Sequence, residues 1–338
     1  MINNVIKNIC HRFIGDRIGK KYGIDYFLFK QVDLSIDYHH CQLFFAYPAI
    51  KQLALSRLNN TVDNYFVNSP KPEVYSISTS YRSLENCQVL YISNVAFIFS
   101  KLVNTPPLEI AKDFATFYAQ TNAQQQDFTL EVVPSGFLQF KLTEFKLANW
   151  LQCLPFLPLT LANLPIPEYS CPVKNNSSLF AIQYAYARCY CLMELAQREG
   201  LITLETITAN QIRSIFPDLI FSCQTSILII NQPQPMPWLN CTQQLQFCHQ
   251  AEYALIIQLV KVVDDLYSSK QSTRNYSFKT ALNLSQAFAD FYSHCRIFGK
   301  TNAQTPKLAQ VRLGLILGTY TILKVLLQRL GVFAPQQL

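Results

Sequence analysis

The stretch LGLILGTYTIL, residues 313–323, lies between Arg312 and Lys324 and contains no charged side chain. Apolar residues continue beyond it at helical spacing to Leu326, and Gly331 is of the residue type that commonly ends a helix. A membrane-spanning helix needs about twenty apolar residues, whereas only eleven lie here without a charge. The stretch therefore predicts a core helix and no membrane span.

Three more helices are predicted in the same half of the chain. Apolar residues recur at intervals of three or four over 247–266 and 281–298, and a helical pattern also covers 179–198. Each helix has an apolar stripe, which is stabilised only when it packs against a partner. Residues 179–338 therefore predict an all-α helical bundle.

Residues 1–155 mix short strands with helices. Apolar and polar residues alternate over 128–132 and 138–142, and the Pro-Ser-Gly turn at 134–136 joins them into a predicted β-hairpin. A threonine, two prolines and an acid at 105–109 predict the start of a helix that the threonine hydroxyl caps. The pattern as a whole predicts an α+β domain.

A proline-rich stretch separates these two regions and ends in a run of polar residues. Proline has no backbone N–H to donate and interrupts helices, so we interpret residues 156–178 as a linker. The prolines in and beside this stretch are Pro155, Pro158, Pro165, Pro167 and Pro172.

The charges are unevenly distributed along the chain. Half of the 338 residues are hydrophobic and 14% are charged, which is typical of a folded protein, and the net charge is +7. The first thirty residues carry six basic residues against two acids, and residues 270–338 carry nine against one. Basic ends are expected if both ends face a polyanion, although ordinary solubilising charges would give the same distribution.

The eleven cysteines are irregularly spaced and include no C-x-x-C pair. Zinc sites need ligands clustered at short, fixed separations, and the five histidines do not supply them. We therefore predict no metal site. The odd number of cysteines and the lack of a secretory signal at the N-terminus favour a reducing cytoplasm.

Several blocks of the second region resemble a known family. The segment FAIQYAYARC, residues 180–189, is similar to the Gln-Tyr-Ala-His-Ala-Arg segment of arginyl-tRNA synthetases, with Tyr186 in place of the histidine. Further blocks follow in the family's order and end in the Arg-Leu-x-Leu and Leu-Gly-x-x-Ala-Pro patterns of its DALR domain, at 252–256, 284–295, 311–315 and 326–335. The resemblance implies an anticodon-binding bundle of the class I synthetase type over about 180–338.

The first region resembles the additional domain that precedes the catalytic core in that family. The similarity is strongest over 85–150 and rests on the blocks at 91–96, 107–111 and 136–140. Only 47 positions separate Gly136 from Gln183, too few for the nucleotide-binding Rossmann domain that lies there in the family. The His-Ile-Gly-His and Lys-Met-Ser-Lys motifs are absent. We therefore expect no Rossmann domain, no catalytic residue and no cofactor.

The resemblance also suggests where RNA would bind, because the helix at 179–198 borders the anticodon stem-loop in the family. Its polar residues are candidate contacts, and an aromatic residue one turn from a cation on the helix at 281–298 suits an unstacked base. Basic residues of the last helix are candidate phosphate contacts, and two of them are expected to be exposed, Lys324 and Arg329. The candidates are Gln183, Tyr184, Arg188, Tyr292, Arg296, Arg312, Lys324 and Arg329.

Each candidate also has a plainer interpretation. Tyr184 could pack in the bundle, Arg188 could pair with an acid such as Glu194, Arg296 could be solvated and Arg312 could be structural. Two functions therefore compete. The first is a non-catalytic protein that binds tRNA, of the arginine type, at the anticodon stem-loop and at the elbow. The second is a structural subunit of a larger protein assembly that no longer binds RNA.

Overall fold

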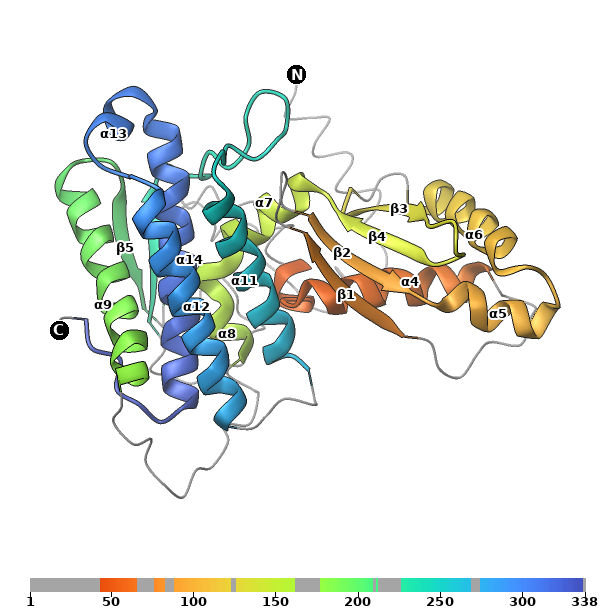
Figure 1. Cartoon of the computed structure of the whole chain (residues 1–338). Helices are drawn as coiled ribbons and strands as arrows, with labels where there is room; N and C mark the ends of the chain where they lie inside the picture. The colour runs from red at the N-terminus through yellow and green to blue at the C-terminus, as the bar shows by residue number, and fades with distance from the viewer. Residues whose placement is uncertain are drawn as a thin grey trace.

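The computed structural model describes residues 43–65, 76–82, 88–122, 126–161, 177–208, 211, 226–268 and 274–336. The basic N-terminal start and residues 162–176 of the predicted linker lie outside these ranges. The described elements form two regions that pack against each other, an N-terminal antiparallel sheet with helices and a C-terminal bundle (Figure 1).

The N-terminal region confirms the predicted α+β fold. Its four strands are all antiparallel to their neighbours, in the order β1-β2-β4-β3, and helices α4 and α6 pack against the sheet. The elements are α4 (Ile50–Tyr65), β1 (Ile77–Arg82), β2 (Gln88–Ser93), α5 (Val95–Val103), α6 (Pro107–Thr121), β3 (Phe128–Val132) and β4 (Leu138–Leu142).

The predicted hairpin is confirmed at its expected bounds, with Phe128 opposite Leu142. Gly136 in its turn has a positive φ of 92° and lies close to Pro107, so a side chain there would be both strained and crowded. Helix α6 begins where it was predicted, but the Thr105 hydroxyl does not cap it. Pro106 occupies the cap position, and the Thr105 hydroxyl bonds to the carbonyl of Val103 at 3.4 Å.

The first part of the predicted linker is helical. Helix α7 (Glu144–Cys153) continues through the 3₁₀ turn η2 (Leu154–Phe156) into the short helix α8 (Leu157–Leu161), and both prolines lie in first turns, where their missing N–H has no helical acceptor. These residues are buried against the bundle. The interpretation of 156–161 as a linker is therefore wrong, and only 162–176 is left outside the described elements.

The C-terminal region is the predicted helical bundle with one addition. All four predicted helices are present, and the short helix α13 precedes the last of them. Two antiparallel strands, β5 and β6, also pack here and were not predicted. The elements are α9 (Ser177–Arg198), β5 (Thr203–Ile207), β6 (Ile227–Gln232), α11 (Gln250–Leu266), α12 (Arg274–His294), α13 (Lys300–Gln304) and α14 (Pro306–Arg329).

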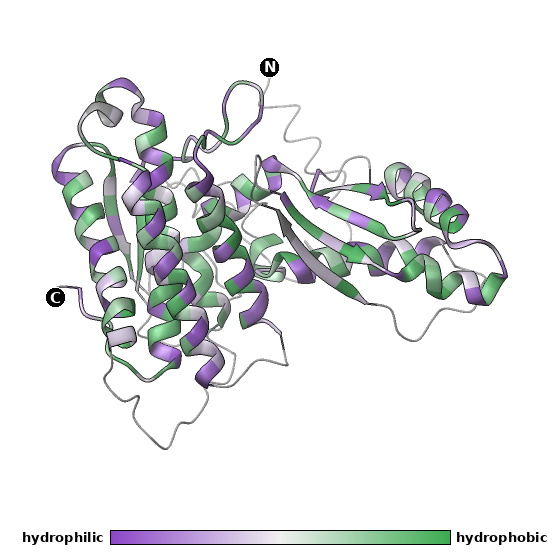
Figure 2. Ribbon diagram, in the orientation of Figure 1, coloured by the Kyte–Doolittle hydropathy of each residue, from purple (hydrophilic) through white to green (hydrophobic). Residues whose placement is uncertain are grey.

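Helix α14 lies at the centre of the bundle. It is long and apolar enough to cross a membrane, but 89% of its apolar window is buried by other parts of the chain. The surrounding helices each carry hydrophobic and hydrophilic residues, as surface helices of a bundle do (Figure 2). Gly314 lets the ring of Trp238 pack directly on the α14 backbone, where a Cβ atom would lie 2.4 Å from the ring.

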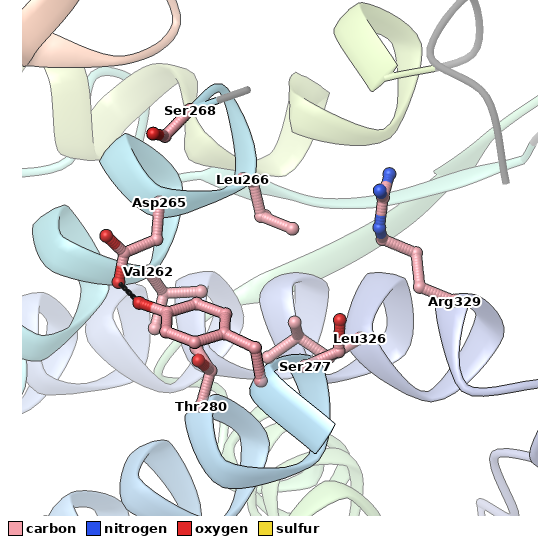
Figure 3. Close-up of a pocket in the computed structure, with 9 residues that line it drawn as sticks. Val262, Asp265, Leu266, Ser268, Ser277, Thr280, Leu326 and Arg329 are labelled. Atoms are coloured by element: carbon pink, nitrogen blue, oxygen red, sulfur yellow. Dashed lines mark hydrogen bonds between the residues drawn. The ribbon is translucent and has the colours of Figure 1, made fainter. Parts of the chain in front are cut away.

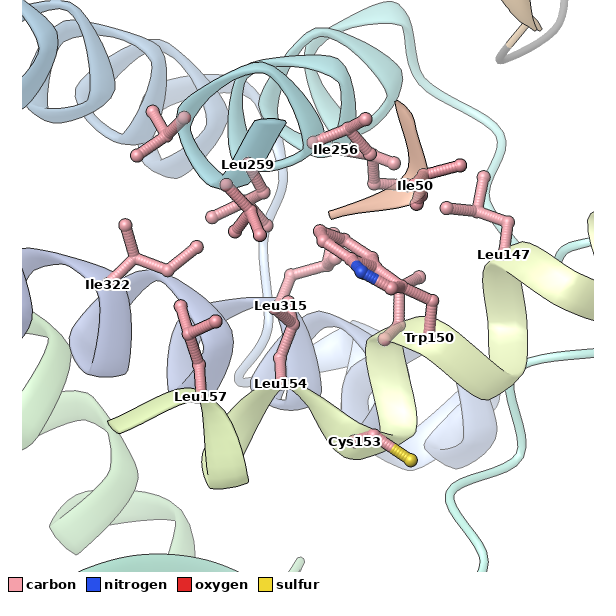
Figure 4. Packing of buried hydrophobic residues seen from close by; sticks show 14 of the residues in the cluster. Ile50, Leu147, Trp150, Cys153, Leu154, Leu157, Ile256, Leu259, Leu315 and Ile322 are labelled. Carbon is pink, nitrogen blue, oxygen red and sulfur yellow. The ribbon is translucent and has the colours of Figure 1, made fainter. Parts of the chain in front are cut away.

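One hydrophobic core joins the two regions. Residues from α4, α7, η2, α8, α11 and α14 meet in it, among them Ile50, Trp150, Ile256 and Leu315 (Figure 4). Hydrogen bonds cross the same boundary. The buried carboxylate of Asp264 in α11 accepts from the Tyr91 hydroxyl at 2.7 Å and from the backbone N–H of Lys51 at 2.9 Å. In the described ranges the sheets contain antiparallel pairs only, so no Rossmann-type sheet is present there.

Candidate nucleic-acid interface

Helix α9 leaves two aromatic rings in solvent. Its buried side, which includes Ile182, Ala185 and Cys189, packs in the bundle. Phe180 and Tyr184 lie one turn apart on the opposite side, so their rings stack on each other with centroids 6.2 Å apart. They are 57% and 53% exposed. The structure thus places Tyr184 at the surface and not in the core.

Arg188 lies one further turn along α9 and contacts helix α12. Its guanidinium carbon is 5.0 Å from the centre of the Tyr292 ring, and a terminal N–H donates to the Tyr292 hydroxyl. This hydrogen bond raises the pKa of Arg188. The Nε–H of Arg188 is buried and has no hydrogen-bond partner in the described part of the chain. Glu194 pairs with Arg198 instead, at 3.9 Å.

Tyr292 and Arg296 complete this surface from α12. The Tyr292 ring is partly exposed and stacks on Phe288 with centroids 6.2 Å apart. Arg296 follows the end of α12 and its side chain is exposed. We call the surface formed by Phe180, Tyr184, Arg188, Tyr292 and Arg296 the α9–α12 face. It combines aromatic rings and cations, the side chains that stack on unpaired bases and contact phosphates.

Gln183 has a different position from its neighbours. It is half-buried, and its side-chain N–H donates to the backbone carbonyl of Phe333 at 3.0 Å. Phe333 belongs to the segment after α14, which we call the C-terminal tail and define as residues 331–336. The Gln183 side chain therefore holds the tail beside α9, and this uses one of its two amide N–H donors.

Arg312 does not reach the surface, so its interpretation as a phosphate contact is wrong. Its Nε–H donates to Glu252 at 2.6 Å, and another N–H donates to the carbonyl of Arg296. Glu252 is fully buried and also accepts from the backbone N–H groups of Cys248 and His249, both at 2.7 Å. Arg312 is thus structural, because it pairs with a buried acid and fixes the end of α12.

Lys324 and Arg329 are half-buried, which corrects the expectation that both are exposed. Burial lowers the pKa of Lys324. Arg329 lines a small pocket at the end of α14, across from Asp265 (Figure 3), which accepts a hydrogen bond from the Tyr276 hydroxyl. The physical reason is that other elements surround most of α14, and in its last turns only Gln328 is exposed. Neither residue belongs to the α9–α12 face.

Sequence patterns did not identify three exposed aromatic residues. Phe180 precedes the candidate helix residues, Phe333 lies in the tail, and Phe137 lies beside Phe97 in the N-terminal region with ring centroids 4.6 Å apart. An aromatic residue off the apolar stripe of a helix is the only signal that the sequence offers, and it applies to Phe180 alone. No group of three or more metal-ligating side chains occurs among the described residues.

Comparisons with known proteins agree with this arrangement. The family model of the DALR anticodon binding domain matches residues 231–338. The chain is also similar to the arginine–tRNA ligase of Salinibacter ruber, with 33% identity over 91 residues, which are 27% of this chain and 16% of that enzyme. No solved structure matches the chain. Residues 231–338 are therefore similar to a DALR anticodon binding domain, in a chain that resembles part of an arginine–tRNA ligase and has no Rossmann-type sheet in its described part.

Proposed function

We propose that this chain is a non-catalytic tRNA-binding protein that holds an anticodon stem-loop on the α9–α12 face. The exposed rings of Tyr184 and Tyr292 carry the proposal, because they lie beside the Arg188 guanidinium on two neighbouring helices. Base edges and phosphates supply acceptors, and unpaired bases stack on the neighbouring rings.

A titration with labelled tRNA at two salt concentrations tests this proposal. We expect micromolar or tighter binding at low salt and a steep loss of affinity at higher salt, because phosphate contacts release counterions from the RNA. An isolated anticodon stem-loop should retain the part of the affinity that the α9–α12 face contributes. Absence of binding to any tRNA at low salt would remove the proposal.

We further propose that the preferred RNA is an arginine-type tRNA, since the similar enzyme is named for that amino acid. Stem-loops of equal length that differ only in their anticodon bases separate base recognition from general attraction to phosphate. A preference for arginine anticodons of tenfold or more supports the assignment. Equal affinity for all of them contradicts it and leaves general tRNA binding in place.

The absence of aminoacylation is supported by the sequence, which lacks both the His-Ile-Gly-His and the Lys-Met-Ser-Lys motif. Activation of an amino acid needs ATP held in a defined orientation beside the carboxylate. The purified chain should therefore not exchange pyrophosphate into ATP in the presence of arginine. Measurable exchange above a boiled control contradicts this part of the proposal.

All described cysteines are free thiols, which suits the proposed reducing cytoplasm.

The N-terminal region is proposed to contact the tRNA elbow. Phe137 is partly exposed, and its ring lies beside that of Phe97 in α5. Lys101 follows Phe97 by four residues on the same helix and has an exposed side chain. An aromatic ring beside a cation suits an unpaired loop base. Replacement Phe137→Leu should weaken binding of the whole tRNA and leave the affinity for the anticodon stem-loop unchanged.

A role as a structural subunit is the second candidate. It is favoured by the exposed apolar side chains at the end of α5, Leu102 and Val103, which do not suit RNA. Purification from the host distinguishes the two. A stable partner that co-purifies without RNA, and is lost on Leu102→Asp, supports this candidate. A monomer that co-purifies with tRNA alone contradicts it.

A further inference from the structure

The C-terminal tail is fixed at several points along its length. Gly331 has a φ of 66°, which turns the chain away from α14, and the N–H of Val332 donates to the carbonyl of Leu327 at 3.0 Å. Gln183 then holds the carbonyl of Phe333, and the Cys191 thiol lies 4.0 Å from the carbonyl of Gln336. The tail therefore runs beside α9, where Figure 1 also shows the end of the chain.

The side chains of the tail alternate in direction. Val332 and Ala334 pack against the hydrophobic core, whereas Phe333 between them is 80% exposed. A phenylalanine side chain is rarely this exposed, because removing its ring from water is strongly favourable. Here the contacts of Val332 and Ala334 and the hydrogen bond from Gln183 hold the backbone on the protein, while the ring lies in solvent. An anchored backbone thus presents an aromatic ring to solvent.

The residue that holds the backbone of Phe333 lies on α9, one of the two helices of the α9–α12 face. Gln183, which holds the carbonyl of Phe333, directly precedes Tyr184 in α9. Tyr184 is stacked on Phe180, and Arg188 follows one turn later. The backbone of Phe333 is therefore held against the same helix that carries two exposed aromatic rings and a cation. That combination suits single-stranded nucleic acid better than an apolar peptide, which needs a contiguous apolar surface.

We propose that Phe333 stacks on an unpaired base of the bound RNA, next to the base that occupies the α9–α12 face. Gln183 acts as a positioning residue, because its hydrogen bond fixes the backbone of Phe333. This inference rests on the proposed tRNA binding and adds a contact from the tail to it. It also assigns Gln183 a role without requiring that its side chain touch RNA.

The variant Phe333→Trp provides a direct measurement. The natural tryptophans, Trp150 and Trp238, are buried with 3% and 5% exposure, so an exposed tryptophan at 333 would be the main one accessible to RNA. We expect an anticodon stem-loop to quench its fluorescence, at the same concentrations at which anisotropy of the labelled RNA reports binding. A double-stranded RNA without unpaired bases should not quench it.

The variant Phe333→Leu tests stacking separately from apolar contact. Leucine keeps an apolar side chain but offers no aromatic face, so we expect the affinity for the stem-loop to fall at least about fivefold. Leu102→Ala, which also changes an exposed apolar residue but lies in α5, is the matched control and should leave this affinity unchanged. Thermal unfolding of both variants should equal that of the wild type, since both side chains are exposed.

The role of Gln183 is tested by combining substitutions. Gln183→Leu should weaken RNA binding in the wild-type background and have little further effect in the Phe333→Leu background, because a positioning residue acts only through the residue it positions. An equal loss in both backgrounds shows that Gln183 contacts RNA itself and overturns its positioning role.

Two results overturn the stacking inference, and they can be distinguished. If the stem-loop binds but leaves the fluorescence of Phe333→Trp unchanged, and Phe333→Leu binds as the wild type does, the tail makes no base contact and the proposed function stands. If the wild-type chain binds no RNA, both proposals fail together.

Discussion

The inner and outer sides of the C-terminal bundle differ in how their polar groups are used. On the inner side, facing the N-terminal region, Asp264 of α11 accepts from the Tyr91 hydroxyl and from the backbone N–H of Lys51. On the α9–α12 face, Arg188 keeps a buried donor without a partner in the described part of the chain. Satisfied polar groups hold the two regions together, whereas the α9–α12 face presents a cation among exposed aromatic rings, which is the combination that the proposed RNA binding needs.

The largest effect is expected inside the bundle, on replacing Glu252 with alanine. This change leaves the buried Arg312 guanidinium without its acid and removes the acceptor of two backbone N–H groups. We expect a loss of about 3–5 kcal/mol in the free energy of unfolding, measured by urea denaturation. Glu194→Ala on the surface of α9 is the control and should cost about 0–1 kcal/mol. Similar losses for the two variants would contradict this account of Arg312.

A pH dependence is expected from the inner boundary. Burial raises the pKa of Asp264 from 3.8 to about 7. The hydrogen bonds from the Lys51 N–H and the Tyr91 hydroxyl and the charge of Lys51 oppose this rise, and the charge of Asp265 adds to it. The folded state therefore binds this proton more tightly than the unfolded state does. The stabilisation that comes from protonated Asp264 is complete below about pH 4 and is lost as the pH rises to about 7.

The variant Asp264→Asn isolates that contribution, because asparagine carries no charge in either state. Its free energy of unfolding should change less between pH 4 and pH 8 than that of the wild type, by an amount on the order of a few kcal/mol. Urea denaturation at several pH values measures the difference. Identical pH profiles for variant and wild type would show that the carboxylate is not buried at the boundary.

The packing of α14 gives a smaller effect. Alanine at position 314 would place its Cβ atom 2.4 Å from the Trp238 ring, so we expect a loss of about 1–3 kcal/mol. At Gly318 the Cβ atom would lie 2.9 Å from the end of the flexible Leu154 side chain, which can move. Gly318→Ala should therefore cost less than Gly314→Ala in the same denaturation experiment. The reverse order would contradict the close approach of Trp238.

The smallest effect on stability, with a large effect on binding, is expected on the outer face. Arg188→Gln removes the cation beside Tyr292 and should weaken stem-loop binding about tenfold, as the loss of a charge-assisted hydrogen bond does. Arg198→Gln on the same helix makes the same change of charge at a well-exposed position and is the matched control. Equal losses for the two variants would mean that α9 attracts RNA by charge alone.

The sequence predicts the elements with regular periodicity, such as the hairpin at 128–142 and helix α14. It does not predict features that depend on distant partners. The burial of Arg312 requires Glu252, which lies 60 positions earlier, and the exposure of Phe333 depends on the tail packing beside α9. The short strands β5 and β6 were missed because no short turn joins them: their nearest pair, Ile207 and Ile227, is 20 positions apart. Proline positions alone also could not distinguish a linker from first turns of helices.

Helix α14 has a consequence for how fragments of this chain should be made. The family match begins at residue 231, yet α14 packs against α7, η2, α8 and α9, all of which precede that position. A polypeptide cut to 231–338 would uncover those apolar contacts on a helix long enough to enter a lipid bilayer. Such a fragment should aggregate or associate with membranes, so the unit that folds is larger than the unit that the family defines.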